Sequence, residues 1–503
     1  MNQKSIAIGI SALAGLGYFL FSYLSDGFYQ HDEITHYIGS KTFWTNPGNN
    51  ISSFSKPGYR AFLSIISPLG YKPAHFFNAI VAGFSIYTTY LVALEMKFKK
   101  PLIPLIILAL TPITVMMSFR SYPGIFTSLV LAIGALNYYR KNFIWAAFFI
   151  AYAGFIRTEL YALSAIFGLY LLFNKQYRAI IVMAAVPILY NLAGWYFSDD
   201  PIYLLSQVFG LSESYSQRYP RQGAEHYPLM SSAIFGSVAI MGLFLYAVAF
   251  FRDKKYRLNS LPILIIAGTF IGVHIIFASK FLNIGPSSGG NLRYFTTVSP
   301  FVALLAGLGY QKLIMIKNKK PYIWAMVAFL IFCGLCQTYD DNLIKHIPNQ
   351  RNWLIIIPPL MASLIAIKSV KKHALLLIFL SLSVQSYVSV KGINLSPEDE
   401  VMKTVATYLK ESPTLSKKII HESHSAFKFF YSSHFDQLKL LTAKSVDEIK
   451  QGELLLWESH YATKPERANL QFESLNSQTD TYRNIQVFQS SDKRFAAALF
   501  ERL

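Results

Sequence analysis

A dense group of titratable side chains lies in the stretch QHDEITHYIGSKTFW, residues 30–44, directly after the first long apolar run. Asp32 and Glu33 are adjacent there, between His31 and His36. A carboxylate in such a position can act as a general base on a hydroxyl group. Histidines beside acids are also metal-ligand types, but no regular ligand spacing occurs elsewhere, so a metal site is not favoured. A solvated pair of loop acids is the alternative interpretation.

Further charged residues stand at the ends of later apolar runs. The motif SFRSYPG contains Arg120, FIRTELY contains Arg157 and Glu159, and KFLNIGPSSGGNLRYF contains Lys280 and Arg293. Ionisable groups near membrane depth are costly and usually mark function, and the planar guanidinium group suits phosphate. The pattern predicts a cavity for an anionic, membrane-borne substrate. Two alternatives stay open: Arg120 as an interfacial anchor, and Arg157 paired with Glu159 to end two short helices.

The composition indicates which elements position these residues. Of the 503 residues, 53% are hydrophobic and only 15% are charged, whereas soluble proteins carry about 25% charged residues. Apolar runs long enough to cross about 30 Å of hydrocarbon recur along the first 390 positions. We therefore predict an α-helical polytopic membrane protein. The net charge of +19 fits basic residues gathered in cytoplasmic loops, so the expected partner is a lipid bilayer and not a nucleic acid.

Basic clusters punctuate the apolar runs and predict one topology. If every cluster is cytoplasmic, the N-terminus lies inside and the chain crosses the membrane about thirteen times. The first run lacks a convincing cleavage site and is interpreted as an uncleaved span. The predicted spans are 5–24, 75–95, 101–118, 122–139, 143–157, 159–173, 179–197, 230–250, 260–279, 294–316, 321–338, 352–367 and 373–390.

Three segments face the outside in this topology, namely the loops 25–74 and 198–229 and the tail 391–503. The tail is polar, and SPEDEVMKTVATYLKE predicts a helix capped by Ser396 with acids in its first turn. The runs KKIIHE, LKLLTA and GELLLWES are strand-like. We predict a membrane module at 1–390 and a small soluble α/β domain at 391–503. Cys333 and Cys336 lie inside an apolar run and are interpreted as small packing residues.

The order of these motifs resembles that of the GT-C superfamily of membrane glycosyltransferases, which take sugars from polyprenyl-phosphate carriers. The closer likeness is to the dolichyl-phosphate-mannose mannosyltransferases of glycosyltransferase family 22. That family opens its first loop with His-Pro-Asp-Glu; HDE at 31–33 is similar but lacks the proline. SFRSYPG at 118–124, IRT at 156–158 and NLRYFTTVSP at 291–300 are similar to later family motifs.

The resemblance implies an inverting sugar transfer with Asp32 as the base that activates the acceptor hydroxyl. Glu33 would hold the acceptor or be the alternate base, and Arg293 would bind the donor phosphate. Weaker candidates for the phosphate are Arg120, Arg157 and Lys280. Candidates for acceptor or sugar binding are His31, His36, Glu159 and Tyr294. A lipid monophosphate donor lacks the diphosphate that metals usually bridge, so no cofactor is expected and a divalent metal is not favoured.

The expected function is therefore transfer of a single sugar, mannose or a similar hexose or pentose, to a glycan, lipid or protein acceptor. Short basic turns and low cysteine use favour a bacterial inner membrane, with the active site and tail on the outer side. A transporter or flippase is the main rival, but it would place charges at the midplane of the membrane. A polymerase or ligase using a lipid diphosphate and a non-catalytic scaffold are further alternatives.

Overall fold

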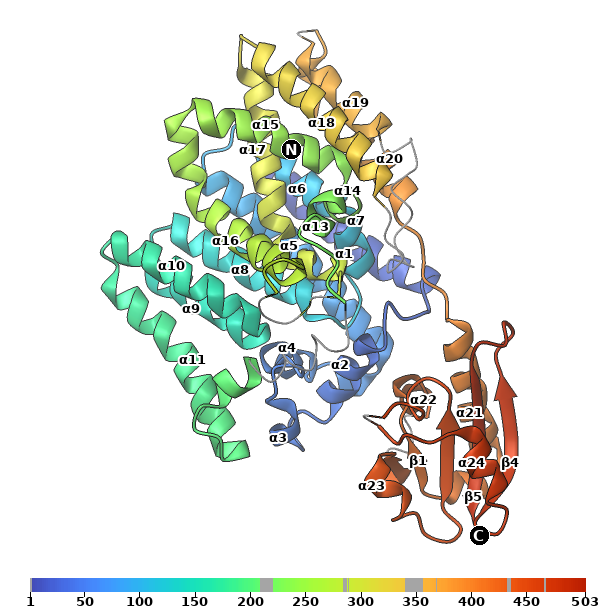
Figure 1. Cartoon of the computed structure of the whole chain (residues 1–503). Helices are drawn as coiled ribbons and strands as arrows, with labels where there is room; N and C mark the ends of the chain where they lie inside the picture. Colours follow the sequence, from blue (N-terminus) through green and yellow to red (C-terminus); the bar gives the residue numbers. More distant parts are fainter. Residues whose placement is uncertain are drawn as a thin grey trace. The chain divides into compact units, whose positions relative to one another are not determined.

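The computed structural model is mostly helical (Figure 1). It describes residues 2–208, 220–283, 287, 289–339, 356–367, 369–431, 436–465 and 467–503. Residues 209–219 of the predicted outer loop and 352–355 of the predicted span 352–367 lie outside the described residues. The chain forms two compact units: one is Met1–Tyr23 with Gly39–Gly392, and the other is Leu24–Ile38 with Ile393–Leu503.

The first unit is built from apolar helices. Among the described residues, five helical segments are long and apolar enough to cross a membrane, namely Gln3–Leu24 (containing α1), α5 (Tyr71–Glu95), α11 (Tyr177–Ser198), α16 (Lys254–Ala278) and Leu292–Met315. Shorter apolar helical segments are α8 (Pro123–Tyr139), α9 (Phe143–Ile156), Thr158–Phe173, α15 (Ser237–Arg252), Lys320–Cys336 and Ile357–Ala366. The predicted helical membrane fold is confirmed, and the number of about thirteen spans stays a prediction.

The individual helices of this unit that have not yet been given by label vary in length, and several lie inside the segments above. They are α3 (Pro47–Asn50), α4 (Pro57–Leu63), α6 (Leu102–Ala109), α7 (Pro112–Met117), α10 (Tyr161–Phe173), α13 (His226–Leu229), α14 (Ser231–Phe235), α17 (Ser299–Met315), α18 (Lys320–Thr338), α19 (Ile357–Ser363) and α20 (Ala374–Ser389). One helix, α2 (Asp32–Lys41), begins in the second unit and ends in the first.

Two predicted spans are interrupted for identifiable reasons. The predicted span 101–118 is the pair α6 and α7, because Pro112 has no N–H for a continuous helix and instead begins the second one. The predicted span 230–250 contains α14 and α15, separated by Gly236 at φ +85°. A Cβ atom on Gly236 would lie 1.9 Å from the side-chain nitrogen of Gln385. Both breaks leave irregular backbone inside protein, where membrane proteins tolerate it.

The core of the first unit is centred on α17, which packs against α15 and α6, while α5 packs against α1 and α8. Polar side chains also join helices here. The Tyr310 hydroxyl donates to the carbonyl of Val238 at 2.7 Å, and the Tyr18 hydroxyl donates to the carbonyl of Ala109 at 2.6 Å. Inside apolar protein these bonds satisfy groups that would otherwise be costly to bury.

The second unit contains a five-stranded sheet in the order β2-β1-β3-β5-β4. Its strands are β1 (Ile420–Glu422), β2 (Leu438–Leu440), β3 (Leu454–Glu458), β4 (Tyr482–Gln489) and β5 (Ala496–Arg502). β1 is parallel to β2 and β3, and β5 is antiparallel to β3 and β4. Every residue of β3 is buried, which is typical of a central strand covered on both faces. The predicted C-terminal α/β domain is confirmed.

Besides the start of α2, the described part of this unit contains the α-helices α21 (Pro397–Glu411), α22 (Ser425–Phe430), α23 (Ala443–Val446) and α24 (Phe472–Ser477). Ser396 begins α21 with a capping box, because its hydroxyl accepts the N–H of Asp399 while the Asp399 carboxylate accepts the N–H of Ser396. The predicted cap at Ser396 is therefore present. It fixes the first turn of α21, which carries Glu398 and Asp399.

Residues 25–38 of the predicted first outer loop, together with Leu24 from the end of the predicted first span, group with this C-terminal sheet unit. The Gly27 N–H donates to the carbonyl of Ile393 at 2.7 Å, and the N–H of Ile393 donates to the Ser25 hydroxyl at 2.8 Å. The ring of Phe28 packs edge-on against Phe429, with centroids 5.3 Å apart. The segment that carries the acidic pair is thus held by the C-terminal residues.

Candidate functional site

In the first unit, three motifs from different parts of the chain meet at Tyr294. The Arg157 guanidinium lies 4.7 Å from the centre of the Tyr294 ring, and the Arg293 guanidinium lies 5.6 Å from it. The Arg293 guanidinium also lies 4.5 Å from the ring of Tyr122, and its Nη1 donates to the Tyr122 hydroxyl at 3.2 Å. Arg157 and Arg293 are both buried. The structure thus brings the predicted Arg157, Arg293 and Tyr294 together.

The cluster of Tyr122, Arg157, Arg293 and Tyr294 depends on a close approach between a 3-10 helix and α8. Arg293 lies in the 3-10 helix η4 (Leu292–Val298), which packs against the start of α8. Gly124 at that start lacks a side chain, and a Cβ atom there would lie 2.1 Å from Oγ1 of Thr296. The Thr296 hydroxyl instead donates to the carbonyl of Arg293 at 2.7 Å. The glycine therefore permits the contact that places Tyr122 beside Arg293.

Arg157 ends α9 in an extended conformation and pairs with Glu159 two residues later. Its Nε donates to Oε1 of Glu159 at 2.8 Å. The ion pair agrees with the alternative that Arg157 and Glu159 pair to end two short helices. The same ion pair also holds the Arg157 guanidinium against Tyr294. The His274 ring stacks on the ring of Tyr294, with centroids 5.2 Å apart. Neither ring nitrogen of the buried His274 has a hydrogen-bond partner among the residues described by the structure.

Arg120 and Lys280, the other two predicted phosphate ligands, differ in burial. Arg120 is almost fully buried in the turn between α7 and α8, and its Nε donates to the carbonyl of Met116 at 3.2 Å. Its own carbonyl accepts the N–H of Tyr122 at 2.7 Å, so it shares a turn with the cluster. A buried position does not fit a solvent-facing snorkelling anchor. Lys280 is exposed just after α16, and none of the contacts that join Arg157, Tyr294 and Arg293 involves it.

In the second unit, the acidic pair occupies the first turn of α2, where carboxylates interact favourably with the helix dipole. Glu33 is fully buried, and its Oε2 accepts the N–H of Tyr29 at 3.1 Å. Asp32 is partly exposed. Of the two predicted bases, Asp32 is therefore the more accessible carboxylate, while Glu33 stabilises the start of its own helix. His36 is buried in the same helix.

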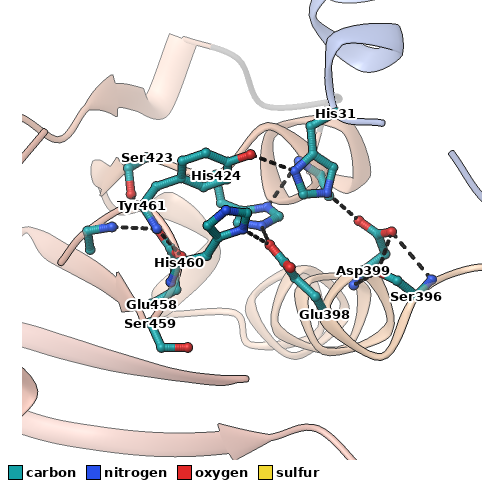
Figure 2. Close-up of polar contacts among 12 residues, drawn as sticks. His31, Ser396, Glu398, Asp399, Ser423, His424, Glu458, Ser459, His460 and Tyr461 are labelled. Carbon is teal, nitrogen blue, oxygen red and sulfur yellow. Dashed lines mark hydrogen bonds and ion pairs between the residues drawn. The ribbon is translucent and has the colours of Figure 1, made fainter. Parts of the chain in front are cut away.

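The predicted acceptor ligand His31 lies in a polar network of the second unit, shown in Figure 2. Its Nε2 lies 3.0 Å from Oδ1 of Asp399, and its Nδ1 lies 2.8 Å from the Tyr461 hydroxyl. Burial lowers the pKa of His31, but the hydrogen bond and charge of Asp399 outweigh it, so the pKa is raised. Nearby, burial raises the pKa of Glu398, but the hydrogen bonds from His424 and His460 outweigh burial, so the pKa of this carboxyl is lowered.

Sequence reasoning left several of these residues unassigned. Tyr122 lies inside the quoted motif SFRSYPG, and a tyrosine beside an arginine in an outer turn is a signal that could have marked it. His274 lies inside a predicted span, and a titratable residue there is itself a signal of function. His424 and His460 are histidines of the tail that lie 36 residues apart in the sequence. Only the fold brings them to His31.

Comparison with known proteins supports the fold. No protein-family model matches the chain, and no curated protein matches it. The structure is similar to the crystal structure of ArnT from Cupriavidus metallidurans in the apo state, with a TM-score of 0.62 and 11% sequence identity. The match covers 99% of this chain and 98% of that chain. The GT-C-like fold is thereby shown, and the narrower likeness to family 22 is not.

Proposed function

We propose that this chain is a membrane glycosyltransferase that moves a single sugar from a polyprenyl-phosphate carrier to a glycan, lipid or protein acceptor of the cell envelope. The observation that carries the proposal is the convergence of the buried Arg157 and Arg293 on Tyr294 within a GT-C-like fold. A buried guanidinium group in a helical membrane module is costly, and an anionic substrate compensates that cost. The ArnT-like fold supports a glycosyltransferase in general.

The proposed chemistry is a direct displacement. The acceptor hydroxyl oxygen attacks the anomeric carbon of the sugar, and its proton passes to the Asp32 carboxylate. The bond between that carbon and the phosphate oxygen breaks, and the polyprenyl phosphate leaves with the electron pair. One displacement inverts the anomeric configuration. Negative charge grows on the leaving phosphate, and a fixed guanidinium stabilises it more in the transition state than in the ground state. This step needs no metal at the phosphate.

The roles follow from the contacts of each residue. Arg293 is proposed as the main phosphate ligand, because its guanidinium is fixed by Tyr122 and lies in a buried site. Arg120 and Arg157 are assigned supporting charge, and the exposed Lys280 is a weaker candidate. Glu33 remains the alternate base. Candidates for sugar or acceptor binding are His36, Glu159 and Tyr294.

Since both ring nitrogens of His31 already have partners in the second unit, the proposal does not keep it as an acceptor ligand. The resemblance to family 22 favours mannose as the first sugar to test, with other hexoses and pentoses after it. The proposed location is a bacterial inner membrane, with the reaction on the outer side.

The test is sugar transfer by the purified full-length protein in detergent, with a panel of polyprenyl-phosphate sugars and a cell-envelope extract as acceptor. Asp32→Asn keeps the size of the side chain and removes the base, so we expect transfer to fall by about 100-fold or more. Asp26→Asn is the matched control, because Asp26 is exposed in the same segment, and it should leave transfer unchanged.

Each outcome is informative. Transfer that survives in Asp32→Asn would keep the enzyme class and move the base to Glu33. No transfer from any carrier by correctly folded wild-type protein would reject the enzyme and favour a transporter of an anionic lipid-linked solute. Equal losses in Asp26→Asn and Asp32→Asn would point to a structural effect of the segment.

A further inference from the structure

We propose that His31, Glu398, His424 and His460 form a binding site for a zinc-class divalent metal ion in the second unit. These four residues come from segments far apart in the sequence, yet one ligand atom of each lies within 4.8 Å of the others. All four residues belong to the second unit, and the inference does not depend on the proposed sugar transfer.

The geometry is centred on the Glu398 carboxylate. Its Oε1 lies 2.6 Å from Nε2 of His424 and 2.7 Å from Nδ1 of His460. The His31 and His424 rings meet edge-on with centroids 4.8 Å apart. Figure 2 shows the three imidazoles directed toward one another beside this carboxylate. Three imidazole nitrogens and one carboxylate oxygen match the ligand types and number that zinc takes.

The sheet explains why two of the histidines meet. β1 and β3 are neighbouring parallel strands, so their carboxyl ends lie at one edge of the sheet. His424 follows the end of β1 by two residues, and His460 follows the end of β3 by two residues. Loops at this edge of parallel strands are where α/β proteins commonly bind ligands. Glu398 reaches the same edge from the first turn of α21.

The turn that carries His460 is itself held by a buried carboxylate. Glu458 is fully buried, and its two oxygens accept the N–H groups of His460, Tyr461 and Ala462 at 2.8 to 3.1 Å. They also accept the Ser423 hydroxyl at 2.7 Å. Because both oxygens of Glu458 already accept hydrogen bonds, we assign Glu458 to orienting the metal ligands and not to binding the metal ion itself. Binding sites need this kind of supporting shell to hold their geometry.

His31 has the support expected of a metal-binding histidine. If its Nδ1 faces the ion, its Nε2–H donates to Asp399, which is the carboxylate–histidine arrangement found behind many metal ligands. The other oxygen of Asp399 is held by the Ser396 hydroxyl at 2.7 Å, so the orienting group is fixed by the helix cap. The Tyr461 hydroxyl lies 2.8 Å from Nδ1 and would release this nitrogen to the ion on binding.

Binding requires that ring protons leave the ligand atoms. In the metal-free form, Nδ1 of His424 accepts the N–H of Ala426 at 3.2 Å, so Nε2 carries the proton directed at Glu398. If a metal ion binds Nε2, the proton would leave Nε2 and Nδ1 would carry one instead, so the 3.2 Å contact with the N–H of Ala426 would be lost. The entry side is at His460, whose side chain is 39% exposed, whereas that of His424 is 0% exposed.

The site has a structural consequence. His31 belongs to residues 24–38, whereas the other three ligands belong to the C-terminal residues. A bound ion would join the two and fix the start of α2, next to Asp32. Metal binding energy would then contribute directly to the folding of this unit.

The test uses full-length protein in detergent, purified without a polyhistidine tag and stripped with a chelator, and titrated with zinc chloride alone. We expect one zinc ion per chain to remain after gel filtration, and the unfolding temperature to rise when it is added back. His460→Ala and Glu398→Gln should lose the bound zinc. The matched controls are His373→Ala and Glu400→Gln, since both residues are exposed and outside the site.

A wild-type protein that binds no zinc would overturn the proposal and leave the cluster as a network of hydrogen bonds. Zinc retained in both site variants would overturn it as well. If a site variant fails to fold, cobalt is added to the stripped wild-type protein in place of zinc. The visible absorption of tetrahedrally bound cobalt would support the site, and its absence would reject it.

Discussion

At the scale of single residues, Arg293 combines a positive charge with a side chain that its neighbours hold in place. Its guanidinium is buried, held by the Tyr122 hydroxyl and placed beside Tyr294. We predict that Arg293→Gln lowers sugar transfer roughly 100-fold, because removing one pre-organised donor typically costs that much in the transition state. Steady-state kinetics with the active carrier would check this, and most of the loss should be in kcat. The matched control Arg252→Gln, at an exposed position, should behave as wild type.

If Arg293→Gln changed only KM, Arg293 would contribute uniform binding of the carrier and not stabilisation of the leaving phosphate. The sequence singled out Arg157, Glu159 and Arg293 as candidates, because charged residues between apolar runs are rare enough to be noticed. It was not sufficient to predict that both arginines approach the ring of Tyr294. It also could not show that the Nε2 of His31 contacts Asp399, because no local pattern encodes a contact across 368 residues.

At the scale of elements, the contact between η4 and α8 determines whether the cluster forms. We predict that Gly124→Ala destabilises the protein by about 1–3 kcal/mol, the usual cost of overpacking, because the added Cβ would lie 2.1 Å from Oγ1 of Thr296. Thermal unfolding in detergent would measure it, and transfer should fall with the displaced Arg293. Gly17→Ala is the control, because a Cβ on Gly17 meets nothing within 4 Å. Equal stability of the two variants would contradict the prediction.

Whether a segment is a helix or a strand was largely predictable where the sequence has a clear hydrophobic run. The three strand-like runs of the tail correspond to β1, β2 and β3. β4 and β5 were missed: β4 exposes most of its residues, and β5 begins with three alanines, which favour a helix until the neighbouring strands override that preference. The break at Pro112 was readable in principle, but hydropathy alone merged α6 and α7 into one span.

At the scale of the whole chain, composition predicted a membrane module and a polar tail but not which residues belong to each folded unit. The change in polarity near residue 391 is visible in the sequence, whereas the inclusion of residues 24–38 depends on bonds such as that from Gly27 to Ile393. Backbone pairing between segments so distant carries no local signal. The orientation of the chain in the membrane, by contrast, is encoded locally in its basic loops.

That orientation gives the last prediction. Because Lys- and Arg-rich short loops stay in the cytoplasm, the cluster KNKK at 317–320 should lie inside and the tail outside. We expect a cysteine introduced as Gln451→Cys to react with a membrane-impermeant maleimide in intact spheroplasts, and one introduced as Lys317→Cys to react only after permeabilisation; both positions are exposed. The buried Cys333 and Cys336 are first replaced by alanine to remove background. The reverse labelling pattern would place the tail in the cytoplasm, and the acceptor would then have to be an intracellular one.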